Sequence, residues 1–274
     1  MKNNLLLIVL LAILVAHCSP LPKQKLSQAK LDKITCEVID DSLRISFNNT
    51  SKGPVTIAAT AADQSVAAQL AADFPVPVDA GEGMYYVYPT DKSKDAIAIQ
   101  FSAAMGNAKS TVAKRAIELP FQTGKKHKII QGYNGTFSHT DAYSRYALDF
   151  DLKIGDTICA AAPGYVVGVI SGYTDGGKSK RWRDYANYIT IFHPDMNLFT
   201  QYGHLMPYGS FVEVGDYVEA GQSIGRAGQT GYTDVEHLHF SVLETKEGGI
   251  QSTPIEFEEG YRGSDLKRGD WVKK

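Results

Sequence analysis

The chain has 274 residues, of which 43% are hydrophobic and 21% are charged. At about 150 residues per domain, this length predicts one large domain or two modest ones. The apolar fraction excludes a disordered chain. Lys and Arg total 28 against 30 for Asp and Glu, and the resulting net charge of -2 argues against nucleic acid as a partner.

The first eighteen residues predict an export signal. Lys2 gives a weakly positive start, and an unbroken apolar run of twelve residues follows over 5–16. Such a run is too short to span a bilayer, which takes about 20 residues, but it suits the apolar core of a secretory signal. Small residues at Ala16 and Cys18 fit cleavage after Cys18, whereas 15–18 also resembles a bacterial lipobox, with Cys18 as the lipid anchor. Either interpretation predicts a protein exported to the bacterial cell envelope, periplasmic or extracellular.

Residues 19–125 predict a polar linker and then a β-sandwich-like N-terminal domain. Short alternating runs and turn signals indicate strands at 42–47, 55–57, 84–88 and 96–101. The Ala-rich stretch at 64–72 is either a short helix or a loop. No histidine lies between His17 and His127, so we interpret this region as a structural or docking module.

Residues 126–274 also predict β structure. Glycines punctuate expected strands at 165–170, 188–192, 212–214, 223–227 and 237–242. No long helical period is present, which favours an antiparallel sheet. Export would permit a disulfide between Cys36 and Cys159, and two separate buried thiols fit the sequence at least as well.

Four histidines and one aspartate in this second region suggest chemistry. His237 and His239 are two residues apart on an expected strand, so their side chains point to the same face. His204 ends another apolar strand, and His139 follows a short polar segment. Asp149 lies within an apolar run, where burying a carboxylate is costly unless it is paired or binds a metal.

Two histidines and one carboxylate, with a position left open for water, form the ligand set of a hydrolytic zinc site. Further histidines nearby would serve as general acid and base. A single histidine is more often an ordinary residue, and an H-x-H pair alone is weak. The metal interpretation therefore depends on the whole constellation.

Several segments, in order from about 131 to 254, resemble the M23 (lysostaphin/LytM-type) zinc metallopeptidases. They are Ser138-His139, Tyr146-Ala147-Leu148-Asp149-Phe150, Tyr202-Gly203-His204-Leu205, Val214–Gly225 and His237-Leu238-His239-Phe240. The resemblance implies a mainly β chain with a LytM-type peptidase domain at 126–274. It also implies Zn2+ as cofactor, with His139, Asp149 and His239 as ligands and with His204 and His237 as catalytic residues.

The activity implied by the resemblance is hydrolysis of peptide cross-links in bacterial peptidoglycan by metal-activated water. The common first motif of the family places the Asp four residues after the His, whereas here the gap is ten, as in a subgroup with a longer loop. Asp141 and Asp151 are the competing carboxylates. Tyr133 stands where some members carry a tyrosine that stabilises the transition state.

Two other functions compete with this one. A non-catalytic LytM-type regulator, which binds and activates cell-wall amidases, would lack zinc ligands, but this chain keeps all five positions. A biotinyl- or lipoyl-like carrier would need a lysine at a hairpin tip, and none lies between Arg183 and Lys246. The loop at 172–183 is either a wall of the substrate groove or a mobile hairpin tip.

Overall fold

The computed structural model describes residues 21–22, 34–91, 93, 97–247 and 249–274. The predicted export signal at 1–18, with Cys18, lies outside the described residues, as does Ala96 of one predicted strand. Within the described part, no helix is long and apolar enough to cross a membrane. The protein is mainly β, with antiparallel pairing throughout its larger sheets.

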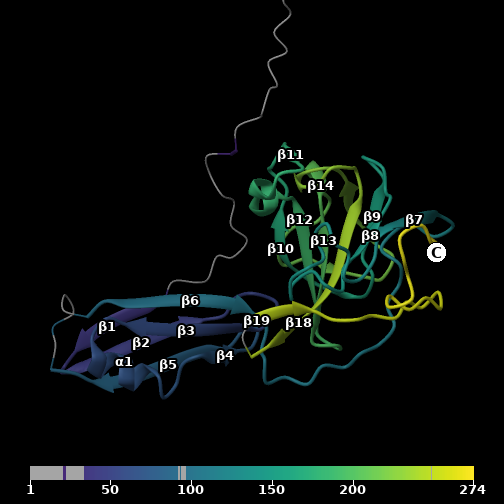
Figure 1. The fold of residues 1–274 in the computed structure, drawn as a ribbon. Coiled ribbons are helices and arrows are strands. Elements are labelled where there is room, and N and C mark those ends of the chain that lie inside the picture. The colour runs from purple at the N-terminus through teal and green to yellow at the C-terminus, as the bar shows by residue number, and fades with distance from the viewer. Residues whose placement is uncertain (1–20, 23–33, 92, 94–96, 248) are drawn as a thin grey trace, which may run out of the picture.

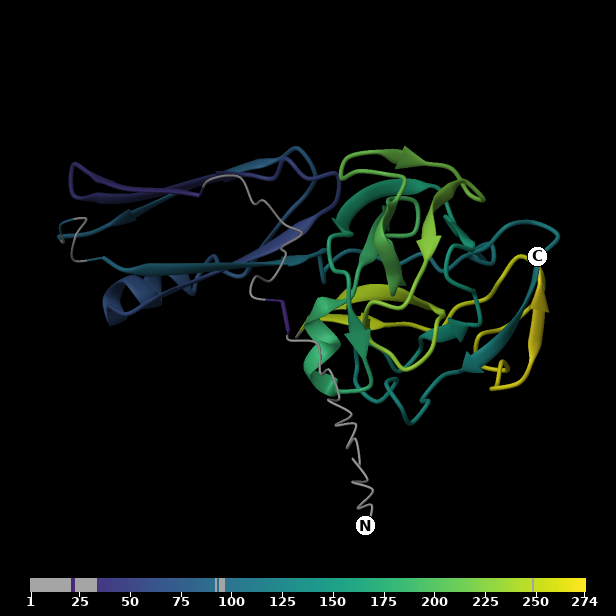
Figure 2. The ribbon, with the colours of Figure 1, turned by 90° about the horizontal axis from the view of Figure 1, so that it is seen from above.

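The N-terminal domain is a β-sandwich of two three-stranded sheets, visible as two layers in Figure 2. One sheet has the order β1 (Thr35–Ile39), β2 (Ser42–Asn48) and β5 (Gly83–Pro89), and the other has the order β4 (Val76–Val78), β3 (Val55–Ala61) and β6 (Ile99–Met105). Alternation along β2 turns Leu43, Ile45 and Phe47 inward, where they share a core with Ile57 and Val78 of the other sheet. The predicted sandwich is therefore confirmed.

The Ala-rich stretch of the N-terminal domain is the helix α1 (Gln64–Leu70). Its N-cap is Asp63, whose side chain accepts hydrogen bonds from the backbone N–H groups of Ser65 and Val66. Val66 and Leu70 are buried in the sandwich core. The N-cap and the buried apolar face therefore stabilise a helix in this stretch, where the sequence allows either a helix or a loop.

The C-terminal domain is built on one long antiparallel sheet (Figure 1). Its order is β15 (Tyr217–Val218), β10 (Gly164–Ile170), β12 (Tyr188–His193), β13 (Leu198–Gly203), β18 (Leu238–Lys246), β8 (Leu148–Phe150), β7 (Lys126–Gln131) and β20 (Trp271–Lys273), with β19 (Gly249–Ser252) paired to β18. A smaller sheet contains β14 (Leu205–Ser210), β16 (Ser223–Ala227) and β9 (Thr157–Cys159). The short strands β11 (Gly176–Gly177) and β17 (Gly231–Tyr232) pair in parallel beside the 3-10 helix η2 (Lys180–Tyr185).

The apolar core of this domain reaches back along the chain beyond β7. Ile117, Leu119 and Phe121 are buried in the same cluster as Ile189 and Phe240. The segment before the predicted domain start at residue 126 therefore packs with the C-terminal domain.

One predicted strand, at 212–214, is wrong. The segment forms a turn: the side chain of Asp216 accepts from the N–H of Glu213, and the Asp216 N–H donates back to the Glu213 carbonyl. Gly215 supplies the φ of +103° that the turn requires. The turn residues therefore override the short apolar alternation of Val212 and Val214.

The two domains meet at the end of β18 that lies far from its histidine (Figure 1). Met105 of β6 packs against Phe199 and Leu243, and Thr245 donates a 3.1 Å hydrogen bond to the Met105 carbonyl. Six residues of strand separate Thr245 from His239, a distance of about 20 Å. Among the described residues, no disulfide joins Cys36 to Cys159, since they lie in β1 and β9 of different domains.

Candidate metal centre

Strand pairing brings a carboxylate and an imidazole together in the middle of the long sheet. Asp149 of β8 and His239 of β18 are direct register partners. On the other side of β18, His239 is paired with Gly203, the last residue of β13. A Cβ at Gly203 would lie 3.3 Å from the His239 Cβ, so the glycine leaves the space above the sheet open.

Three ligand-type atoms converge at this point. His139 Nε2 lies 3.2 Å from Asp149 Oδ1, His239 Nδ1 lies 2.9 Å from the same oxygen, and the two nitrogens are 3.3 Å apart. His139 and Asp149 are buried, and His239 is nearly so. His139 lies in the loop after β7, and the fold places it beside Asp149 although ten residues of sequence separate the two.

Outer hydrogen bonds set which nitrogen of each ring faces the centre. His139 Nδ1 donates to the Gly132 carbonyl at 2.9 Å, which leaves its Nε2 lone pair toward Asp149. His239 is turned the other way, with Nδ1 at the centre and Nε2 at 3.2 Å from the Ser241 hydroxyl. When Ser241 accepts from Nε2–H, the lone pairs of both nitrogens face the Asp149 carboxylate, and a proton or a metal cation between these atoms stabilises the arrangement.

The second carboxylate oxygen of Asp149 is also held. Gln131 Nε2 donates to Asp149 Oδ2 at 3.0 Å and lies 2.8 Å from the Ser138 hydroxyl. Burial would raise the pKa of Asp149, but the neighbouring histidines, His237 and His139 above all, hold that pKa well below its usual range. Asp149 is therefore an anion fixed at both oxygens.

Two more imidazoles stand beside the three. His204 Nδ1 donates to the Thr230 carbonyl at 2.6 Å, and His237 Nδ1 donates to the Val235 carbonyl at 2.9 Å. Their ring centroids are 4.5 Å apart, and His237 Nε2 lies 3.7 Å from Asp149 Oδ1. Burial, together with His237 and His239, lowers the pKa of His204 to about 3. His237 therefore turns its Nε2 toward the centre, and the His204 ring lies with its centroid 5.9 Å from that of His239.

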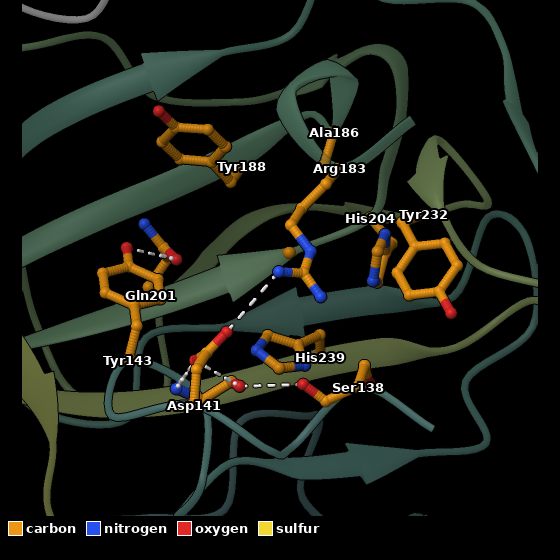
Figure 3. A pocket seen from close by; sticks show the side chains of 12 residues that line it. Ser138, Asp141, Tyr143, Arg183, Ala186, Tyr188, Gln201, His204, Tyr232 and His239 are labelled. Atoms are coloured by element: carbon orange, nitrogen blue, oxygen red, sulfur yellow. Dashed lines mark hydrogen bonds and ion pairs between the residues drawn. The ribbon is translucent and has the colours of Figure 1, made fainter. Parts of the chain in front are cut away.

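A groove of about 220 Å³ opens over His204 and His239 (Figure 3). Its walls include Tyr143, whose hydroxyl donates to Gln201 at 2.9 Å. Arg183, the last residue of the segment 172–183, also lines it. Tyr143 and Gln201 are not among the residues predicted from the sequence, although Gln201 shares a strand face with Gly203 by simple alternation.

The competing candidates serve other contacts. The Asp141 carboxylate accepts from the Ser144 N–H and hydroxyl, and Asp151 accepts from the Lys128 N–H. Tyr133 accepts a 3.1 Å hydrogen bond from the N–H of Ile255 and packs against the domain core. Its hydroxyl therefore braces the fold instead of facing the groove.

The fold and this site define a β domain with a buried centre of two histidines and one carboxylate beside an open groove. Residues 143–252 match the model of Peptidase family M23. The chain therefore carries an M23 peptidase domain, and its histidine–aspartate cluster fits a metallopeptidase.

Several solved structures are similar to parts of the chain. The catalytic domain of the antimicrobial peptidase lysostaphin from Staphylococcus simulans is 28% identical, with 47% of this chain and 87% of that one covered and a TM-score of 0.32. A zinc containing peptidase from Vibrio cholerae is 18% identical, with 74% and 75% covered and a TM-score of 0.35. Csd3 from Helicobacter pylori is 20% identical, with 86% and 70% covered and a TM-score of 0.35. No curated protein matches the chain.

Proposed function

We propose that this protein is an exported zinc metalloendopeptidase that hydrolyses the peptide cross-links of bacterial peptidoglycan. The observation that carries the proposal is the convergence of His139, Asp149 and His239 on one point, with two further imidazoles beside it. The M23 match over 143–252 supports the same activity.

The donor set fits zinc. Ligand atoms about 2.0–2.1 Å from a tetrahedral zinc ion lie roughly 3.3 Å from one another. The three ligand atoms here are 2.9 to 3.3 Å apart. In this proposal His139 Nε2, His239 Nδ1 and Asp149 Oδ1 hold the ion, which supplies a Lewis acid that polarises a peptide carbonyl and acidifies water.

In the proposed reaction one of the two rings, His204 or His237, serves first as the general base and then as the general acid. Each has its Nδ1–H committed to a backbone carbonyl, so each Nε2 is free to accept a proton from the attacking water. The same proton is then given to the amine that leaves when the peptide bond breaks. The Thr230 and Val235 carbonyls fix both rings in the required tautomer.

The groove is the proposed peptide-binding site. Tyr143 and Tyr188 give it aromatic walls, and Gln201 offers an amide to a peptide backbone. An open groove suits an extended peptide that forms part of a large polymer, because the polymer can continue beyond both ends of the site. This arrangement supports a cross-linked peptide as the substrate.

The decisive experiment uses the mature protein and purified peptidoglycan. New amino groups should appear with the zinc-loaded protein, disappear with a chelator and return when zinc is restored. If none appear under any condition, the proposal is wrong. The non-catalytic regulator is then tested by adding a cell-wall amidase and measuring whether the protein stimulates it.

Export and the lipid anchor form a separate part of the proposal. The apolar run at 5–16 supports export, and Cys18 is the residue that would carry the lipid. Mass spectrometry of the mature N-terminus distinguishes simple cleavage from lipidation at Cys18. An intact Met1 in protein from the native host would exclude both.

A further inference from the structure

One cationic side chain projects into the groove beside the centre. Arg183 belongs to η2, and Figure 3 shows its guanidinium between Tyr188 and Gln201 on one side and His204 and Tyr232 on the other. It is the sole lysine or arginine among the 12 described residues that line the groove. The positive charge of Arg183 and the ring of His239 therefore line the same groove.

The partner of Arg183 within the chain holds it only loosely. Arg183 Nη1 is 3.7 Å from Asp141 Oδ2, and both side chains are about half exposed, at 50% and 48%. A charge-assisted hydrogen bond would be about 2.7–2.9 Å long, and exposed ion pairs contribute little to stability. The pair is therefore too weak to be the main reason for a guanidinium at this place.

Asp141 is much better fixed than the arginine it faces. Its Oδ1 accepts from the N–H of Ser144 at 3.0 Å and from the Ser144 hydroxyl at 2.8 Å. The Tyr232 ring, 5.9 Å from the Arg183 Cζ, limits the guanidinium on another side. Asp141 and Tyr232 thus orient the arginine over the groove and leave most of its donors available.

A guanidinium with free donors has a defined chemical preference. It carries five N–H groups in a planar fork that matches a carboxylate with two parallel hydrogen bonds. One oxygen at 3.7 Å does not use that fork, so a carboxylate from the substrate can take the donors that face away from Asp141. An uncharged peptide of small residues would leave the fork without a partner.

We propose that Arg183 selects peptides that carry a free carboxylate next to the scissile bond. This inference rests on the proposed peptidase function and narrows its substrate class from cross-linked peptides in general to anionic ones. Arg183 is a specificity-determining residue here and takes no part in proton transfer.

The test compares two synthetic cross-linked peptides that differ only in a carboxylate or a carboxamide beside the scissile bond, prepared for each side of that bond. In the wild-type protein we expect kcat/KM to be about tenfold or more higher for one carboxylate peptide than for its carboxamide partner. Arg183→Gln should remove that preference, because kcat/KM for the carboxylate peptide should fall to the value measured for its carboxamide partner. Arg183→Lys should restore part of it, because the charge returns without the fork.

Arg181→Gln is the matched control, because Arg181 lies in the same 3-10 helix and does not line the groove. It should keep the full preference. If Arg183→Gln slows both peptides equally, Arg183 only braces the groove wall and the inference is wrong. Equal cleavage of both peptides by the wild-type protein would also overturn it while leaving the peptidase function intact.

Binding separates this inference from the proposed function. The same peptides are titrated into His204→Ala and into His204→Ala with Arg183→Gln, where hydrolysis is blocked. A carboxylate preference in Kd that depends on Arg183 supports the inference even if the wild-type protein cleaves nothing. No preference in Kd, together with none in kcat/KM, rejects it.

Discussion

The two domains bury very different chemistry. The sandwich core is apolar, and Asn49 is the one buried polar side chain of the N-terminal domain within the described residues. The C-terminal domain buries two carboxylates, Asp149 and Glu244, and three imidazoles, besides many hydroxyl and amide groups. Both domains consist mainly of antiparallel β-sheets, so the difference is not a consequence of the fold class.

The free-energy cost of burying polar groups makes this difference between the two domains informative. A buried polar group without a partner costs roughly 1–3 kcal/mol, and a buried charge costs more. The Asn49 amide offsets the cost of its burial by donating hydrogen bonds to the Gly53 and Val78 carbonyls, and these bonds stabilise the loop after β2. The cluster around Asp149 instead directs acceptor atoms at one another, which opposes stability unless a cation is bound. Polar burial of that kind distinguishes the domain that holds the candidate metal centre.

The largest expected effect comes from removing one of the proposed ligands. His239→Ala deletes the Nδ1 that lies 2.9 Å from Asp149 Oδ1, so zinc should no longer bind and hydrolysis should fall to background. Metal analysis of the purified variant measures the zinc content. His127→Ala, which changes a histidine outside the centre, should keep one zinc per chain. Equimolar zinc in His239→Ala would refute the ligand assignment.

His204→Ala should separate metal binding from chemistry. His204 faces the centre from the end of β13, but its Nε2 is not one of the three converging atoms. We expect full zinc content and a kcat about 10²–10⁴-fold lower, as is typical for loss of a general base. Loss of zinc in this variant would make His204 a ligand and would remove the proposed base.

His193 tests whether the C-terminal domain also buries imidazoles for structure alone. Its ring lies between the Pro163 carbonyl and the Thr200 hydroxyl, each 2.8 Å away, and burial lowers its pKa to about 4. Because the folded pKa lies below the unfolded value of about 6.5, the neutral ring stabilises the protein above pH 6.5. That contribution, about 3 kcal/mol, is lost as the pH falls toward 4.

The measurement is urea unfolding of the wild type and His193→Gln between pH 7 and pH 4.5. The variant should lose less stability with falling pH than the wild type, and zinc content at pH 7 should not change. Parallel pH curves for the two proteins would show that His193 does not titrate with folding.

Much of this comparison could be predicted from the sequence, because alternation is a local signal. The spacing of Leu43, Ile45 and Phe47 predicts an inward face, and the H-x-H pair predicts that His237 and His239 share one. The sequence pattern predicts a strand at 212–214, where the structure has a turn. Two valines at that spacing suit either structure, and the hydrogen bond from the Glu213 N–H to the Asp216 side chain favours the turn.

The outer contacts of the site could not be predicted in this way. Gln131 reaches Asp149 because β7 and β8 pair with a register shift, and nothing in the sequence marks that shift. The role expected for Tyr133 likewise fails on long-range packing, since its hydroxyl meets the N–H of Ile255, which is 122 residues away. Contacts between residues far apart in the sequence therefore determine the partners of these side chains, which the local sequence pattern does not specify.

Gln131→Leu tests one of these outer contacts. It removes the 3.0 Å hydrogen bond to Asp149 Oδ2 and leaves the three proposed ligands in place. Loss of such a support typically costs about 10–100-fold in metal affinity. Competition with a chromophoric chelator measures the zinc Kd. Gln251→Leu changes the same residue type in strand β19 of the same sheet and should leave the Kd unchanged, whereas an unchanged Kd in Gln131→Leu would contradict the proposed support.

The smallest effect should come from the N-terminal domain, because the proposed zinc ligands lie in the other domain and only stability is at stake. Asp63→Ala removes the N-cap of α1, whose side chain accepts from Ser65 N–H and Val66 N–H, and should cost about 1 kcal/mol. Asp63→Asn keeps an accepting oxygen and should cost less. Zinc content and hydrolysis should stay at the wild-type level in both variants, because α1 packs on the sandwich core and the centre lies in the other domain. Loss of zinc or hydrolysis in Asp63→Ala, with the C-terminal domain still folded by circular dichroism, would show that the sandwich governs the site through the contact between Met105 and Thr245.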